Sequence, residues 1–236
     1  MIDCAAIEKQ LTHQLGLSRR PVAVAFREEP PPGLTKYEGV QPSGCSFWKL
    51  ASDGHAFYTV AADHYNCPIG SHTHNIPLPA ERAHELGDTL GFMTSIGYLR
   101  MEEVPGIPQL PRTPGVVVYA PLADMPIDPD VVLFWGPPGR VMLLQEAAIR
   151  AGIAVGLNTL ARPTCMVLPA ALAHGVVAST GCVGNRVYTD LDDADLYVAV
   201  PGKDLGRVVE ETATISSANR TLEEYHRGRR LQMASA

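Results

Sequence analysis

The chain has 236 residues, of which 46% are hydrophobic and 19% are charged, and its formal net charge is -6. This length is enough to bury a full hydrophobic core, and the composition is that of an ordinary globular protein. No apolar run reaches the roughly 18 residues that a membrane span needs, and the acidic balance with dispersed Lys and Arg argues against nucleic acid as a partner.

The first half of the chain alternates helical and strand-like segments. Residues 3–16 have helical spacing and lack a basic leader region, so we expect an amphipathic first helix, no signal peptide and a cytoplasmic protein. A strand is expected at 21–26, then a helix in "CSFWKLAS" and a strand in "AFYTVA". The clearest amphipathic helix runs from Pro79 to about Ile96.

The second half continues this alternation. Strands are expected in "GVVVYAPL" (115–122) and "DVVLFWG" (130–136), followed by a helix that ends at Gly152. The segment "ARPTCMVLPAALAHG" then precedes a strand candidate "VVAST", a turn "GCVGNR" and an apolar strand "DLYVAVPG". The last region is helical, with an expected break at 214–217.

These elements predict an α/β fold, with mixed α+β as the alternative, in which helices cover a central sheet. We expect one domain over residues 1–236, and two intimately packed halves, about 1–112 and 113–236, are an alternative organisation within it. The pattern does not order the strands in the sheet.

Four of the five cysteines lie in turn-rich segments. Cys4 falls in the first helix and is interpreted as a small buried hydrophobe. The other four have Gly, Pro or Ser within a few residues, which is typical of tight turns and helix starts: Cys45, Cys67, Cys165 and Cys182. Disulfides are the weaker interpretation, because the cytosol is reducing.

Four thiols on separate turns match the ligand count of an iron-sulfur cluster or of a structural zinc site. The pair Cys67-Pro68 adds to this, because a cluster-ligating cysteine of bacterial ferredoxins is followed by proline. We therefore expect an iron-sulfur cluster, with 4Fe-4S favoured, at the four cysteines. Zinc, haem, a nucleophilic thiol and four isolated thiols remain alternatives.

The segment "HYNCPIGSHTHN" (64–75) also contains three histidines. His72 and His74 are two residues apart, so they point to opposite faces of a strand or about 200° apart on a helix. We expect that they do not share one metal ion, and that either one acts at the site only by orienting a ligand or substrate.

Other side chains near the cysteines are candidates for chemistry. His64 and Tyr65 are candidate proton donors beside Cys67, and Arg162 and Arg186 are candidates for binding an anion.

Three functions remain open. The first is an enzyme that acts on a small anionic substrate at or near a cluster. The second is a carrier of haem, a cluster or a soft metal without turnover. The third is a thiol enzyme with Cys67 as nucleophile and His64 or His72 as base. A small-molecule ligand is expected, without membrane or nucleic acid, and residues 37–48 are a candidate surface for a homodimer.

The segments "GCSFWKLA", "HYNCPIGSHTHN", "GFMTSIGY", "RPTC" and "GCVGNR" resemble those of a prokaryotic family called domain of unknown function 169, once labelled an archaeal cysteine-rich family. The resemblance extends over nearly the whole chain. It implies a cytosolic prokaryotic protein with one family domain, whose characteristic segments contain Cys45, Cys67, Cys165 and Cys182. It implies no activity, and "HTH" and "DLDDAD" depart from the family pattern.

Overall fold

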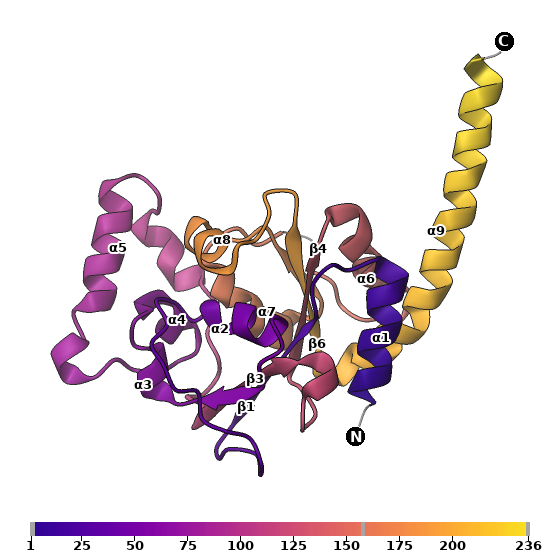
Figure 1. Ribbon diagram of the computed structural model, residues 1–236. Coiled ribbons are helices and arrows are strands. Elements are labelled where there is room, and N and C mark those ends of the chain that lie inside the picture. The colour runs from indigo at the N-terminus through magenta and orange to yellow at the C-terminus, as the bar shows by residue number, and fades with distance from the viewer. Residues whose placement is uncertain (1–2, 157–158, 235–236) are drawn as a thin grey trace.

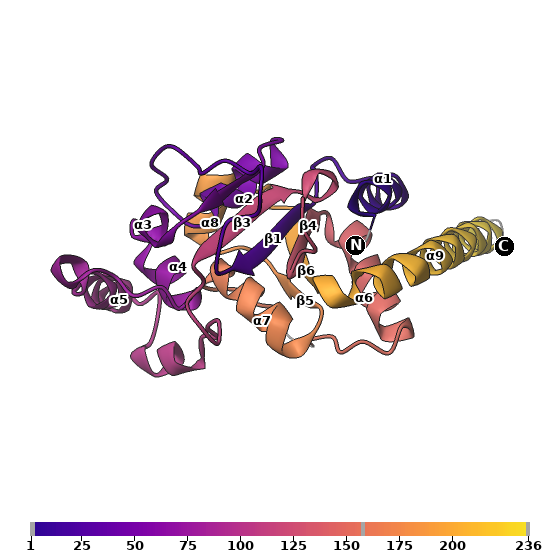
Figure 2. The ribbon, with the colours of Figure 1, turned by 90° about the horizontal axis from the view of Figure 1, so that it is seen from below.

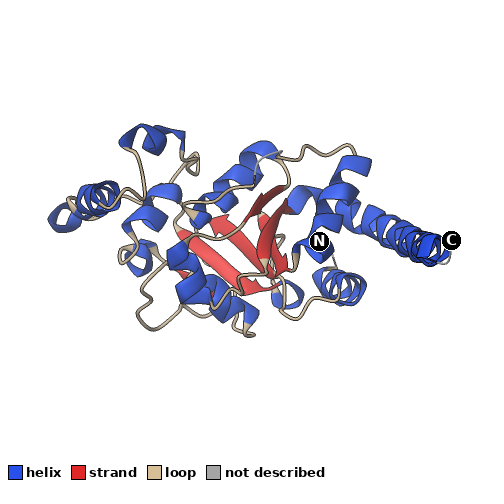
Figure 3. Cartoon of the chain, turned by 90° about the horizontal axis from the view of Figure 1, so that it is seen from above, coloured by secondary structure: helices blue, strands red, loops and turns tan. Residues whose placement is uncertain are grey.

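The structure is a computed structural model that describes residues 3–156 and 159–234. At its centre is a six-stranded sheet with the strand order β2-β3-β1-β4-β6-β5, surrounded by helices (Figure 3). The strands are β1 (Val22–Arg27), β2 (Phe57–Thr59), β3 (Val116–Pro121), β4 (Val131–Gly136), β5 (Val177–Ser179) and β6 (Leu196–Pro201). The five strand pairings described are antiparallel.

The strands read as continuous apolar runs because both faces of the sheet are covered. On β4, Val132 and Phe134 face one core, whereas Val131, Leu133 and Trp135 face the other. Each strand expected from the sequence is present, and the mixed α/β class is confirmed. Side chains alternate across a strand, so two buried faces leave no polar positions to mark an outer side.

One face of the sheet carries a layer of three helices, here called the first layer: α1 (Cys4–Leu15), α6 (Pro138–Arg150) and α9 (Leu205–Ala234). Figure 1 shows them together at one end of the molecule. Leu11, Leu15 and Leu144 are fully buried there. Cys4 belongs to the same core, which confirms its interpretation as a small buried hydrophobe.

The helix α9 is continuous, so the break expected at 214–217 is wrong. Thr212 donates its hydroxyl hydrogen to the Val208 carbonyl, and Ser216 is buried. The short polar side chains that suggested a break are therefore accommodated within the helix. Beyond residue 220 the helix is exposed almost throughout and projects away from the body of the protein (Figure 1).

The opposite face carries a second layer of short helices, seen from below in Figure 2. They are α2 (Ser46–Ser52), α3 (Ala61–His64), α4 (Pro68–Thr73), α7 (Val167–His174) and α8 (Val183–Thr189). The helix α5 (Glu85–Ser95) packs on α4 and lies farther out, at the left of Figure 2. Single 3₁₀ turns connect elements in both layers: η1 (Ala80–Arg82), η2 (Met101–Gly106), η3 (Leu122–Asp124), η4 (Thr164–Met166) and η5 (Gly202–Asp204). The helix expected over 79–96 is split into η1 and α5.

The sheet does not divide at residue 112. Strand β3, from the second half of the chain, lies between β1 and β2 of the first half. The two halves therefore share one sheet. Within the described ranges, no helix is both long and apolar enough to cross a membrane.

Candidate functional site

Cys45, Cys67 and Cys182 occupy N-cap positions, where the chain turns into α2, α4 and α8 respectively. Pro68 follows Cys67 at the first position of α4, where its fixed φ suits a helix start. Cys165 lies in the 3₁₀ turn η4, directly before α7. The four turn positions expected from the sequence are thus ends of second-layer elements.

The thiols of these four residues lie close enough to affect one another's ionisation. Burial raises the pKa of Cys45 to about 12, and the neighbouring Cys67 and Cys182 add to this rise. Burial also raises the pKa of Cys67, with a contribution from Cys182. It raises that of Cys165 well above the ordinary value, with contributions from the other three thiols. The four segments therefore meet in one buried region.

Backbone and hydroxyl groups surround two of the sulfurs. The Ser43 Oγ lies 2.8 Å from the Cys45 Sγ, and the Gly70 N–H donates to the Cys67 Sγ at 3.3 Å. A Cβ at Gly70 would lie only 2.8 Å from that sulfur, so this position requires glycine. The Gly44 N–H also points to Cys67 and opposes the rise in its pKa. Such hydrogen bonds to sulfur favour a thiolate once a ligand is bound.

Hydrogen bonds also connect the cysteine segments to one another. The Cys182 N–H donates to the Thr164 hydroxyl, which precedes Cys165. The Thr73 hydroxyl, at the end of α4, opposes the rise in the pKa of Cys165. Asn185 on α8 is buried and acts in the same way on Cys45. The site is thus held by contacts between α2, α4, η4 and α8.

Aromatic rings form one wall of the site. Tyr119 on β3 is fully buried, and its pKa is raised well above 10.0 by burial and then by Cys45, Cys165 and Cys67. Its hydroxyl therefore faces the thiols. Tyr119 was not among the site residues predicted from the sequence, although it is the one side chain of the run "GVVVYAP" with a hydroxyl group.

His64, one of the two candidate proton donors, is held in its neutral form. Burial, and then the neighbouring His74, lower the pKa of His64 well below 6.5, so the imidazole is neutral at neutral pH. Burial also lowers the pKa of His74, to about 4. The ring centroids of these two histidines are 5.5 Å apart. Tyr65, the other candidate, directly follows α3 at its C-cap and is half-buried.

The two arginines differ in what they contact. Arg186 donates to the carbonyls of Asp192 (2.7 Å), Asp195 (3.1 Å) and Thr180. It thereby fixes the turn after α8, and these carbonyls occupy donors that the sequence analysis offered to an anion. Arg162 pairs with Glu103 at 3.1 Å and lies over the Tyr98 ring, 5.1 Å from its centroid.

Tyr98 connects the arginine to the cysteine site. Burial and then the Cys182 thiol raise the pKa of Tyr98, so its hydroxyl lies near that sulfur. Cys182 and Cys67 are half-buried, whereas Cys45 and Cys165 are buried. The side of the site with Cys182, Tyr98 and Arg162 is therefore nearest to solvent.

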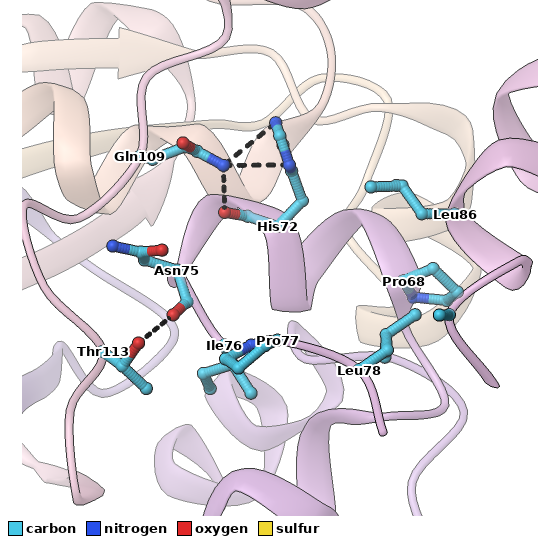
Figure 4. A pocket seen from close by; sticks show the side chains of 10 residues that line it. Pro68, His72, Asn75, Ile76, Pro77, Leu78, Leu86, Gln109 and Thr113 are labelled. Carbon is cyan, nitrogen blue, oxygen red and sulfur yellow. Dashed lines mark hydrogen bonds between the residues drawn. The ribbon is translucent and has the colours of Figure 1, made fainter. Parts of the chain in front are cut away.

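His72 lies outside the cysteine site. It lines a surface pocket of about 310 Å³ together with Pro68, Leu86 and Gln109 (Figure 4). The Gln109 Nε2 donates to the His72 carbonyl at 2.9 Å and also lies against the imidazole. His74, two residues later, is buried against Phe26 and His64. The two histidines thus have different surroundings.

Within residues 3–156 and 159–234, no three His, Cys, Asp or Glu side chains form a group that could hold a metal ion.

One family model, DUF169, described as "Uncharacterised ArCR", matches residues 10–211. This match includes the four site cysteines and excludes Cys4 and the exposed end of α9. No curated protein and no solved structure matches the chain.

Proposed function

Because the chain belongs to the DUF169 family, whose description names no activity, we propose its function from the site alone: the four cysteines bind an iron-sulfur cluster, with 4Fe-4S favoured. The observation that carries this proposal is that the four cysteines lie in one region: Cys67 and Cys182 add to the rise in the pKa of Cys45, and Cys45, Cys67 and Cys182 add to that of Cys165. Four thiolates are the ligand set of such clusters.

The surroundings of Cys67 suit a cluster ligand. Hydrogen bonds from the Gly44 and Gly70 N–H groups to Cys67 are of the kind that tunes cluster potentials.

The ionisation of the thiols argues against the thiol-enzyme alternative. A nucleophilic cysteine needs a lowered pKa, usually through a neighbouring base or cation. Burial raises the pKa of Cys67, and the nearby His64 uses its Nε2 on Thr59. A metal centre, in contrast, displaces the thiol protons itself when it binds.

A small molecule would reach the cluster from the side of Cys182, where Tyr98 and Arg162 lie. If only three of the four cysteines bound irons, the fourth iron would be open and would supply a Lewis acid. Tyr98 and Arg162 would contact the bound molecule, and the Arg162 guanidinium, shared with Glu103, is the cation available for an anionic group. Turnover at the cluster is favoured over a carrier role by this partly exposed side. The proposed compartment is the cytoplasm, where thiols stay reduced.

The test is anaerobic reconstitution of the full chain with iron and sulfide, followed by iron and sulfide analysis and electron paramagnetic resonance of the reduced protein. The variants Cys45→Ser, Cys67→Ser, Cys165→Ser and Cys182→Ser should each lose the native cluster signal. Cys4→Ser is the matched control, because it changes the same group on the opposite face of the sheet and should retain full iron content.

Circular dichroism checks that each variant is folded. The proposal is overturned if the folded parent protein binds no iron and sulfide. It is equally overturned if the protein binds one zinc ion that depends on these four cysteines, or if the four variants retain the parent's cluster.

A further inference from the structure

Three buried polar rings lie beside the cysteine site, on separate elements. His64 ends α3, His74 follows α4, and Tyr119 lies in the middle of β3. The two histidines are 1% exposed and Tyr119 is 0% exposed. The centroid of the His64 ring lies 5.5 Å from that of His74 and 6.4 Å from that of Tyr119. The proposed cluster leaves all three side chains without a role.

Hydrogen bonding determines which nitrogen of His74 carries the proton. The Nδ1 lies 2.8 Å from the Gly70 carbonyl oxygen, which can only accept a hydrogen bond. The Nδ1 therefore donates, and the lone pair of this neutral ring is on the Nε2. The Nε2 is buried and has no hydrogen-bond partner.

His64 is oriented in the opposite sense by a chain of two hydrogen bonds. The Thr59 hydroxyl donates its single hydrogen to the Val117 carbonyl at 3.2 Å. The same oxygen lies 2.8 Å from the His64 Nε2, and with the hydroxyl hydrogen assigned to Val117 it accepts there, which assigns the ring proton to the Nε2. The lone pair of His64 is then on the Nδ1, which is also buried without a partner.

Two buried lone pairs without partners need an explanation, because a buried acceptor that lacks a hydrogen bond destabilises the fold. The second ring nitrogen of a metal-binding histidine almost always donates to a carbonyl, a carboxylate or water, which fixes the tautomer and aims the first nitrogen. His74 has this arrangement directly, and His64 has it through Thr59. The Tyr119 oxygen is a third buried polar atom without a partner.

The separation of the rings fits a shared ion. With metal–nitrogen bonds of about 2.0–2.1 Å, each imidazole centroid stands roughly 3.2 Å from the metal, so two rings at a tetrahedral angle have centroids roughly 5.2 Å apart. The separation found here is 5.5 Å.

We propose that the His64 Nδ1 and the His74 Nε2 bind one divalent first-row transition ion such as Zn²⁺ or Fe²⁺, with the Tyr119 oxygen as a third ligand. Imidazole suits these ions, and a phenol oxygen adds a harder ligand, so that the set lies between hard and soft. The absence of three grouped His, Cys, Asp or Glu among the described residues agrees with a site that has only two histidines. A small molecule would take the fourth position. The site does not depend on the proposed cluster.

The experiment is a titration of iron-free full-length protein with Zn²⁺, followed by nuclear magnetic resonance of ¹⁵N-histidine and ¹³Cβ-cysteine labels. The ¹⁵N signals of the His64 Nδ1 and the His74 Nε2 should shift together, at a single equivalent of zinc. The cysteine signals report any zinc at the four thiols as a separate event. His72, two residues from His74 and in contact with Gln109, is the internal control and should not shift.

Three variants sharpen the result. Thr59→Val is nearly isosteric, removes the group that orients His64, and should weaken zinc binding at the histidines about 10- to 100-fold. Tyr119→Phe should weaken it too, whereas His72→Ala should leave it unchanged. Failure of the His64 and His74 signals to move up to two equivalents would overturn the proposal, as would unaltered zinc affinity in Thr59→Val and Tyr119→Phe. Loss of the cluster in the cysteine variants leaves this test unaffected.

Discussion

The two layers that cover the sheet are built differently. The first layer, α1, α6 and α9, packs Leu and Val side chains on Ala23, Phe134 and Val198 of the strands, and its single cysteine is a small hydrophobe. The second layer consists of short helices, and the same sheet turns Tyr119 and Tyr197 toward it. It also contains the four clustered thiols and two buried histidines. The core on one face of the sheet is thus almost entirely apolar, whereas the core on the other face includes the polar side chains of the candidate site.

The largest expected effect is a loss of stability from a substitution in the first layer. Leu144→Ala removes a fully buried side chain and should lower the free energy of unfolding by about 2–5 kcal/mol, measured by urea denaturation. The iron content per folded chain should not change. Leu168→Ala, equally buried in the second layer, is the matched change and should lower both stability and iron content. Equal iron loss in the two variants would mean that the layers are not separate in function.

The pH dependence of iron-free protein should come from the second layer. The pKa of His74 is lowered from 6.5 to about 4, so the unfolded chain takes up a proton first as the pH falls. The stability is therefore fully present above pH 6.5 and declines toward pH 4, by about 1.4 kcal/mol per pH unit and about 3 kcal/mol in total. His64 shifts in the same direction and should steepen the decline. Urea titrations across this range would measure the free energy of unfolding at each pH. A value that did not change with pH would contradict the burial of both rings.

Arg186→Ala tests whether Arg186 binds an anion at the candidate site or only stabilises the turn after α8. Loss of hydrogen bonds to the carbonyls of Asp192, Asp195 and Thr180 should destabilise the protein by about 1–3 kcal/mol, measured by thermal unfolding. The exposed Arg229→Ala is the control and should have little effect. The electron paramagnetic resonance spectrum of reconstituted protein should be the same in the parent and Arg186→Ala. If added carboxylates changed the spectrum of the parent but not that of Arg186→Ala, Arg186 would bind an anion at the site.

The smallest effect should come from the end of the first layer. Removing the residues after Arg220 deletes an almost entirely exposed part of α9 but keeps the contact between Asn219 and Glu146. The free energy of unfolding should change by no more than about 0.5 kcal/mol, measured by urea denaturation. A larger loss would show that this segment has a partner in solution.

The sequence predicted the strands well because their apolar runs are bounded by Gly, Pro and Asp. It did not predict their order, because the insertion of β3 between β1 and β2 depends on contacts between distant residues. It overestimated the break in α9, since tertiary packing of Ser216 outweighs local propensity.

The candidate site was predicted in part. Turn chemistry singled out the four cysteine segments, since Gly and Pro beside each cysteine indicate where the chain turns. Spacing also separated His72 from His74. No local pattern marked Tyr119, whose role depends on which face of β3 is turned to the thiols, or showed that Arg186 is taken up by the carbonyls of its own turn.

The interleaving of the two halves in one sheet has a consequence for synthesis. A chain emerges from the ribosome N-terminus first, at about 5–20 residues per second. Cys45 and Cys67 are exposed before β3 exists to fill the gap between β1 and β2, and Cys165 and Cys182 follow only after β4 and α6. Until β3 is synthesised, the first half of the chain therefore has unpaired strand edges and two exposed thiols. Delivery of the proposed cluster would therefore belong at the end of synthesis, when α8 has left the ribosome and all four sulfurs can meet.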